Sequence, residues 1–489
     1  MTNKKNLKVN IFFNMLKSLM HIIFPLISFP YAARVLGVDN IGKVQYCNSI
    51  VSYFVLFAGL GIANYATREG TRYRNDREKL SKFAKEVLSI NVVSTIISYS
   101  VLFIVANVYL ESYLNLLIIS SFLIAFTTFS IDWVYQIVED FAYISIRTIV
   151  VQFFSLICLL LVVKTSEDYM VYAAITVVAN GGNCIFNWIH SRKYIDWFKK
   201  SEKLEIKQHL KPVLVIFSIS ASASIYLHLD SVMVGAMRGD HETGLYGAST
   251  KLATVVKSVI TSISAVLLSR LSFYVNNREG VKYKSLLSNA VNCVLMIAIP
   301  CGIGLAVLRK EILFLFCGKE FMDATFASLI LSVNMVFSVT DGMIYNQIFL
   351  PLKMEKQASI ATFAGAISNF LLNYFFILRW GFSGAAVTTL ISECLVFIIL
   401  STFASKRISM KELFSYTYQY AMGGLSIVLI GLLISFLIEN LYVRIALTML
   451  TSITSYFAIL IAFKNQYLNM AVSGIIRFLN LAKARWFVG

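Results

Sequence analysis

The sequence predicts an all-α polytopic membrane protein with about fourteen transmembrane helices. Its 489 residues are 58% hydrophobic and only 14% charged, and the mean hydropathy is +0.72. Soluble proteins usually carry roughly 25% charged residues, so these side chains cannot cover a surface that faces water. The composition therefore excludes a soluble multidomain enzyme, and it also excludes a disordered chain.

The individual helices follow from apolar segments that are long enough to cross a bilayer. Crossing ~30 Å of hydrocarbon takes about 20 helical residues. The first segment follows basic residues, as a signal peptide does, but it contains polar side chains and lacks a small-residue cleavage site, so we expect it to be retained. The fourteen predicted segments are residues 10–33, 43–66, 84–108, 113–136, 142–163, 168–190, 212–236, 244–269, 285–308, 324–350, 355–378, 382–404, 414–437 and 441–463.

The basic residues predict which side of the membrane each loop faces. An even number of segments places both termini on one side, and with that side inside, the inner loops hold 31 Lys and Arg against 9 in the outer loops. This asymmetry is the positive-inside pattern of a membrane protein whose termini face the cytoplasm. It accounts for most of the +17 net charge, so no nucleic-acid partner is needed to explain the basicity; the acidic inner leaflet is a sufficient partner.

Neither the cysteines and histidines nor the loops predict a disulfide framework, a metal site or a catalytic domain. The seven Cys contain no C-x-x-C pair and the five His have no metal-ligand spacing, so we expect no disulfide framework, no metal and no cofactor. The longest outer loop runs from Arg309 to Asp323, which leaves no room for an external catalytic domain. The sequence therefore predicts a protein that is not an enzyme.

Ordered similarities between the two halves predict an internal duplication. Gly37 and Gly42 correspond to Gly235 and Gly244, Asp132 corresponds to Asp341, and two Ala and a Thr in the sixth segment correspond to the same residues in the twelfth. Six segments separate each pair, so the copies have the same orientation. The predicted domains are an N-lobe at 1–208, a parallel C-lobe at 209–408, two appended helices at 409–464 and a tail at 465–489, either an interfacial helix or a frayed end.

Polar residues at helical spacing within the segments predict a hydrated cavity, because a charge at the bilayer centre costs about 2.5–3.5 kcal/mol. Lys257 lies near mid-depth, where a cavity role is favoured. Lys17 and Lys251 are shallower, and snorkelling to the surface is an equal alternative. The candidate substrate-binding residues are Asn14, Lys17, His21, Asn48, Lys251 and Lys257.

Acidic residues within the segments are candidates for ion or proton coupling. Glu393 lies near the midplane, where it either pairs with a basic group or carries a proton. The other three lie nearer helix ends, where capping or an interfacial ion pair is an alternative role. The candidate coupling residues are Asp132, Asp230, Asp341 and Glu393.

Longer runs of the sequence resemble a known family. The first half contains FPYAARVLGVDNIGKVQYCNSIVSYFVLFAGLGIANYATRE (residues 29–69) and IDWVYQIVEDFAYISIRTIVV (residues 131–151), and the second contains LDSVMVGAMRGDHETGLYGASTK (residues 229–251) and NFLLNYFFILRWGFSGAAVTTLISE (residues 369–393). These runs resemble Wzx-type flippases for lipid-linked oligosaccharides, within the superfamily of multidrug, oligosaccharidyl-lipid and polysaccharide exporters. The resemblance covers nearly the whole chain, and it says less about the substrate than about the superfamily.

The resemblance implies two six-helix lobes around a central, often cationic, cavity. It implies alternating-access transport of an undecaprenyl-diphosphate-linked oligosaccharide from the cytoplasmic to the outer leaflet, for O antigen, capsule or another surface glycan. Membrane lipids, a polysaccharide polymerase and glycosyltransferases are the implied partners, and the two appended helices are expected to form a groove for the polyprenyl tail. A cation-coupled multidrug exporter of the same superfamily and, less favoured, a membrane-bound polymerase are the alternative functions.

Overall fold

The computed structural model describes residues 7–199, 204–470 and 472–473. Every regular element in these ranges is a helix, which confirms the predicted all-α fold class. The chain separates into two compact units. Unit 1 comprises residues 1–247 and 370–385, and unit 2 comprises residues 248–369 and 386–489. The division into lobes at 1–208 and 209–408 stays a prediction, and most of the predicted tail lies outside the described residues.

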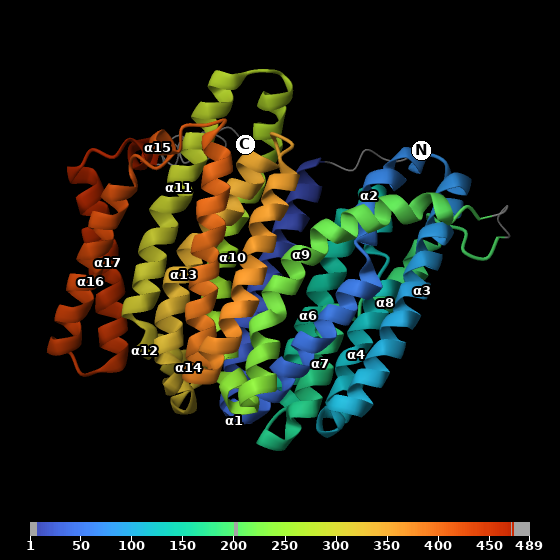
Figure 1. Cartoon of the computed structure of the whole chain (residues 1–489), viewed down its shortest axis with the longest axis horizontal. Helices are drawn as coiled ribbons and strands as arrows, with labels where there is room; N and C mark the ends of the chain where they lie inside the picture. Colours follow the sequence, from blue (N-terminus) through green and yellow to red (C-terminus); the bar gives the residue numbers. More distant parts are fainter. Residues whose placement is uncertain (1–6, 200–203, 471, 474–489) are drawn as a thin grey trace, which may run out of the picture. The chain divides into compact units, whose positions relative to one another are not determined.

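Nine α-helices, α1 to α9, lie in the first half of the described chain (Figure 1). Short 3-10 turns, Thr71–Tyr73, Glu111–Tyr113 and Ser166–Asp168, connect several of them. The α-helices are α1 (Leu7–Gly59), α2 (Ile62–Gly70), α3 (Arg77–Tyr109), α4 (Leu114–Phe129), α5 (Asp132–Ile137), α6 (Phe141–Val162), α7 (Tyr169–Gly181), α8 (Cys184–Ser191) and α9 (Lys207–Arg238).

The second half continues with eight further α-helices. The 3-10 helix η4 (Lys319–Ala324) precedes one of them, and the π-helix η5 (Tyr345–Phe349) extends it. The α-helices are α10 (Asp240–Asn276), α11 (Gly280–Val307), α12 (Arg309–Cys317), α13 (Thr325–Ile344), α14 (Glu355–Ser405), α15 (Met410–Leu413), α16 (Thr417–Leu437) and α17 (Leu441–Ala462).

All fourteen predicted segments lie on helices. Among the described residues, ten helices are long and apolar enough to cross a membrane. Two of them, Leu16–Tyr73 and Glu355–Ser405, each overlap two predicted segments. The seventh and eighth predicted segments lie on α9 and α10. The chain is therefore a multi-pass membrane protein, as its composition indicates.

Glycines make the turns between the paired segments. The helical path is interrupted inside α1 at Gly37 (φ 77°, ψ 175°) and inside α14 at Gly381 (φ 58°, ψ −143°), conformations that side chains with a Cβ rarely adopt. Gly239, between α9 and α10, has nearly the same backbone conformation as Gly37 (φ 85°, ψ −168°). The structural counterpart of Gly37 is therefore Gly239 and not Gly235, because the turn conformation lies at the later glycine.

A second glycine pair allows α1 and α10 to cross at close range within unit 1. A Cβ on Gly42 would overlap the backbone carbonyl of Asp240, and a Cβ on Gly244 would overlap the carbonyl of Val38. The contact is reciprocal, because Gly42 of α1 meets Asp240 of α10 and Gly244 of α10 meets Val38 of α1. Val38 and Asp240 occupy matching positions, since each directly follows the glycine of its turn. Gly42 and Gly244, which the predicted duplication pairs, are thus the small residues at one helix crossing.

The core of unit 1 includes a buried polar group at the start of α9. His209 lies between the Glu86 carboxylate, 2.9 Å from its Nε2, and the Tyr65 hydroxyl, 2.7 Å from its Nδ1. Phe83 and Trp133 pack in the same apolar cluster. These contacts hold α2, α3 and α9 together because each buried polar atom finds a partner.

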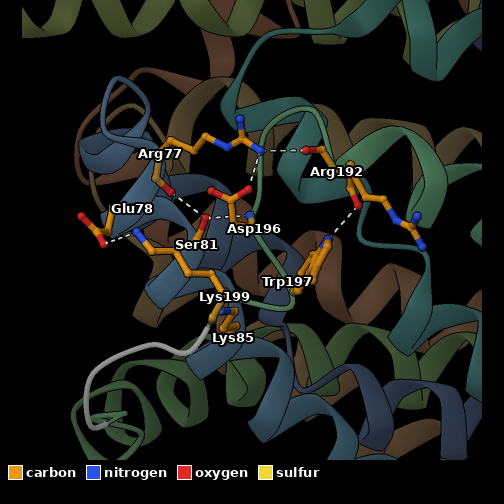
Figure 2. A network of polar contacts seen from close by, with 9 residues as sticks. Arg77, Glu78, Ser81, Lys85, Arg192, Asp196, Trp197 and Lys199 are labelled. Carbon is orange, nitrogen blue, oxygen red and sulfur yellow. Dashed lines mark hydrogen bonds and ion pairs between the residues drawn. The ribbon is translucent and has the colours of Figure 1, made fainter.

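A surface network joins the first turns of α3 to the segment after α8 (Figure 2). Arg77 pairs with Asp196 at 2.5 Å, and the Asp196 backbone N–H donates to the Ser81 hydroxyl at 2.9 Å. Lys199 pairs with Glu78 at 2.9 Å. The network therefore holds the start of α3 and the segment after α8 together within unit 1.

In unit 2, α11 packs against both α13 and α16, and α16 packs against α17. The Tyr456 hydroxyl donates to the Met296 carbonyl at 2.8 Å, which joins α17 to α11. Near the other end of these helices, Arg444 of α17 pairs with the buried Glu311 of α12 at 2.9 Å. The two helices after the predicted repeat, α16 and α17, therefore pack against α11 and α12 within unit 2.

Candidate functional site

A polar cluster lies between the helices of unit 1, among α1, α5, α6 and α8, and we call it the Arg147 cluster. Sequence analysis singled out three of its members, Lys17, His21 and Asp132. It did not single out Arg147, which lies within the predicted segment 142–163 and which the structure places inside α6 with 6% of its surface exposed. The Arg147 cluster comprises Lys17, His21, Asp132, Arg147, Gln152 and Asn187.

Asp132 is the central acceptor of the cluster. Arg147 donates from Nη2 to its Oδ1 at 3.0 Å, and the Asn187 side-chain amide donates to the same oxygen at 2.8 Å. Asp132 is the first residue of α5, where the unpaired backbone N–H groups of a helix favour a carboxylate. The residue before it, Ile131, has a left-handed backbone (φ 42°), which turns the chain between α4 and α5.

The α1 side of the cluster adds positive charge. Lys17 is half-buried and interacts electrostatically with Asp132 and Arg147. One turn later, the His21 ring lies with Nδ1 3.3 Å from the Gln152 side-chain amide. The spacing of four residues places Lys17 and His21 on one face of α1, as the polar stripe predicts.

Arg147 has more donors than the protein uses. Its Nε and Nη1 are buried and meet no acceptor among the described residues, while its Cζ lies over the Tyr143 ring, 5.6 Å from the ring centre. A guanidinium has five N–H donors in a rigid plane that suits phosphate oxygens. With two basic side chains, Lys17 and Arg147, against one carboxylate, the cluster is suited to an anion.

The other predicted binding residues lie elsewhere. Asn48 accepts a hydrogen bond from the Ser120 hydroxyl at 3.0 Å in unit 1. Lys251 is half-buried on α10 in unit 2, and the Asn14 side chain lies outside the described part of the structure. Whether the three predicted lysines face one cavity stays a prediction, because Lys17 belongs to a different unit from Lys251 and Lys257.

Asp230 forms a separate buried contact in unit 1. It accepts hydrogen bonds from the Tyr246 hydroxyl and from the Asn373 side-chain amide, each at 2.7 Å. The contact joins α9 to α10 and to the first part of α14. A role for Asp230 in ion coupling stays a prediction.

Two of the candidate coupling residues, Asp341 and Glu393, lie together in unit 2 beside Lys257. Lys257 donates to the Ser338 hydroxyl, and Ser338 donates to Glu393 Oε1 at 3.2 Å. Asp341 interacts with both Glu393 and Lys257. The sequence singled out Asp341, Glu393 and Lys257 one at a time, from their positions within the predicted segments. The fold adds that the three are neighbours.

A family match accompanies this geometry. Residues 7–273, more than half of the chain, match the family described as "Polysaccharide biosynthesis protein". The chain belongs to this family. The match includes the whole Arg147 cluster together with α9 and most of α10.

Two relatives of this family member are named as an O-antigen transporter and a glycan biosynthesis flippase. A "Putative O-antigen transporter" of Escherichia coli (strain K12) is 22% identical over 412 residues, which is 82% of this chain and 97% of that protein. A "Probable low-salt glycan biosynthesis flippase Agl15" of Haloferax volcanii is 24% identical over 226 residues, which is 45% of this chain and 46% of that protein.

Solved structures show the same fold. A lipid II flippase MurJ in an inward closed conformation aligns with a TM-score of 0.74 at 18% identity, covering 93% of this chain and 99% of that one. An inward-facing multidrug resistance MATE transporter aligns with a TM-score of 0.64 at 15% identity, covering 83% and 98%. The family member thus shares its architecture with both lipid flippases and drug transporters.

Proposed function

We propose that this polysaccharide biosynthesis protein flips polyprenyl-diphosphate-linked oligosaccharides from the cytoplasmic to the outer leaflet of a bacterial inner membrane. The observation that carries the proposal is the buried Arg147 guanidinium, with two unused donor nitrogens beside Lys17. A diphosphate sugar is anionic and strongly hydrated, so it cannot cross hydrocarbon unaided. Charge-assisted hydrogen bonds from Arg147 and Lys17 would replace the water that its phosphates lose.

The position of the cluster fits loading from the inside. Asp132 and Arg147 lie near the helix ends that the positive-inside pattern assigns to the cytoplasm. The diphosphate of a precursor made inside the cell would meet these residues first. Both termini would then be cytoplasmic, and the glycosyltransferases that build the oligosaccharide and the polymerase that extends it are the partners we expect on either side.

The lipid tail would occupy apolar surface of unit 2. A cavity of about 350 Å³ lies against α11 and α17, and its lining is almost entirely apolar, including Met296, Pro300, Leu305, Ile453 and Phe457. Such a surface suits a hydrocarbon chain and offers nothing to a sugar. This cavity supports the proposed groove for the polyprenyl tail, because α17, one of the two helices after the predicted repeat, forms part of its wall.

The multidrug alternative fits the cluster less well. A cationic drug calls for acidic or aromatic lining, whereas Lys17 and Arg147 outnumber the one carboxylate of the Arg147 cluster. The fold likeness to drug transporters does not distinguish the two functions. A drug-efflux measurement with the same vesicles as below would support this alternative if it showed uptake and the glycolipid assay showed none.

The test is reconstitution of the purified chain into vesicles with a fluorescent polyprenyl-diphosphate oligosaccharide, followed from one leaflet to the other. Arg147→Gln and Lys17→Met should each slow flipping about tenfold or more, since a hydrogen bond to a charged group contributes about 1.5–3 kcal/mol and ~1.4 kcal/mol is tenfold. The matched control is Arg72→Gln, whose side chain is 72% exposed and pairs with Glu69 on the surface. Wild-type flipping rates in the Arg147→Gln, Lys17→Met double variant would contradict the proposal.

A further inference from the structure

A pair of carboxyl groups lies in the interior of unit 2. Asp341 on α13 is 6% exposed, and neither of its oxygens meets an N–H or O–H donor among the described residues. The group within hydrogen-bonding reach of Asp341 is the carboxyl of Glu393 on α14. Two ionised carboxylates cannot form a hydrogen bond with each other, because both are acceptors. A proton on one of them turns this contact into a hydrogen bond.

A lysine reaches the same pair from a third helix. The Lys257 ammonium on α10 donates to the Ser338 hydroxyl, which in turn donates to Glu393 Oε1 at 3.2 Å. Ser338 and Asp341 are three residues apart on α13, so they share one helix face. Lys257 also interacts electrostatically with Asp341. The three helices therefore direct one cation and two acids toward each other.

Charge counting determines how many protons the site holds. With both carboxylates ionised, Lys257 leaves one negative charge uncompensated, and burying an unpaired charge is strongly unfavourable. One proton makes the site neutral and supplies the missing donor. The same reasoning explains why two carboxylates sharing a site elsewhere in proteins hold one proton between them.

The surroundings offer little to compensate a second negative charge. Besides Lys257, the thiol of Cys394 interacts with the two acids. The hydrophobic cluster around α13 includes Leu295, Met335, Val339 and Val396 from α11, α13 and α14, and the other buried polar side chains of α13, such as Asn334 and Thr340, carry no charge. No cluster of three or more His, Cys, Asp or Glu that could bind a metal occurs in the described ranges. The site is therefore built for a proton and not for a multivalent cation.

We infer that Asp341 and Glu393 form one proton-binding site, neutral with a single shared proton and Lys257, whose proton exchanges with water when the transport cycle opens unit 2. The coupling part of this inference rests on the proposed flippase function; the shared proton does not. Lys257 then serves as the permanent counter-charge of the site, in place of the role in substrate binding that the sequence suggests for it.

Infrared spectroscopy of the purified full-length chain in lipid nanodiscs tests the shared proton without any substrate. At neutral pH the wild type should show the C=O stretch of a buried protonated carboxyl, and the band should shift in D₂O. Asp341→Asn and Glu393→Gln should each abolish the band, because the remaining carboxylate is balanced by Lys257. Asp323→Asn, an exposed acid in η4, is the matched control and should leave the band intact.

A charge variant provides an independent check. Lys257→Met removes the counter-charge, so the site needs a second proton and the band should become stronger. A wild-type protein without the band, or a band that survives both acid variants, would overturn the inference. If the variants fail to fold, titration of the wild-type band with pH decides the question, since a shared proton must leave at high pH.

Coupling is tested by flipping in vesicles with and without a pH difference across the membrane. The wild-type rate should change with the pH difference, and the Asp341→Asn, Glu393→Gln double variant should lose that dependence while retaining flipping. A wild-type rate that responds to sodium and not to pH would overturn the coupling. The absence of all flipping would contradict the proposed function alone, because the infrared result stands without it.

Discussion

At the residue scale, the pairing of Arg147 with Asp132 has two effects that oppose each other. The carboxylate compensates a buried guanidinium, whose side chain is 5% exposed, and thereby stabilises unit 1. It also reduces the positive charge that a phosphate would meet. The same contact is therefore favourable for folding and unfavourable for anion binding, and the two effects can be separated by one substitution.

Asp132→Asn should lower stability and tighten diphosphate binding. Its side chain is 35% exposed, so the cost should fall below that of a fully buried pair, at about 1–2 kcal/mol. Thermal unfolding in detergent measures the loss, and calorimetry with inorganic diphosphate measures the gain in affinity. Arg147→Gln is the comparison, because it should weaken both. An Asp132→Asn protein that binds diphosphate more weakly than wild type would contradict an anion site at this cluster.

At the element scale, the start of α10 repeats the turn inside α1, and the two copies contact each other in unit 1. The His241 ring lies with Nδ1 2.7 Å from the Asp39 carboxylate, and these residues occupy the same place in the two copies. Gly42 and Gly244 occupy another matching place at the crossing. A local two-fold contact of this kind explains why small residues recur at both positions.

Gly42→Ala and Gly244→Ala should each destabilise the protein, because a Cβ at either position overlaps a backbone carbonyl. Overpacking at a rigid contact costs roughly 1–3 kcal/mol. Gly280→Ala is the matched control, since no atom lies within 4 Å of its added Cβ. Fluorescence-detected thermal unfolding should show a lower midpoint for the first two variants and an unchanged midpoint for the control. Equal midpoints for all three would show that the crossing is loosely packed.

Prediction from the sequence succeeded where a property repeats along one helix and failed where it depends on neighbours in space. Long apolar runs marked the fourteen predicted segments, and all of them lie on helices in the structure. The polar stripe placed Lys17 and His21 on one face of α1. Arg147 was missed because it stands near a segment end, where a basic residue is usually solvated. Its burial depends on Asp132 and on α8, a contact between helices that no single-helix pattern records.

At the scale of the whole molecule, the proposed orientation in the membrane rests on the distribution of charge, and it would govern how the site is loaded. The inner loops would hold 31 of the 43 Lys and Arg, and inward anchoring of basic loops by the translocation machinery and acidic lipids favours this topology. The Arg147 cluster would then face the side on which glycan precursors are made. An inverted protein would offer it to the wrong leaflet.

Cysteine labelling in intact cells tests this orientation directly. In a cysteine-free background that replaces all seven native cysteines, Glu167→Cys and Asp323→Cys should react with a membrane-impermeant maleimide from outside. Lys79→Cys and Lys411→Cys should react only after the membrane is permeabilised. All four side chains lie at exposed positions of the structure, so differences in labelling report the side of the membrane and not burial. The reverse pattern would place Arg147 and Asp132 toward the outer leaflet, and a flippase that loads precursors from the cytoplasm could not then use them as its first contact.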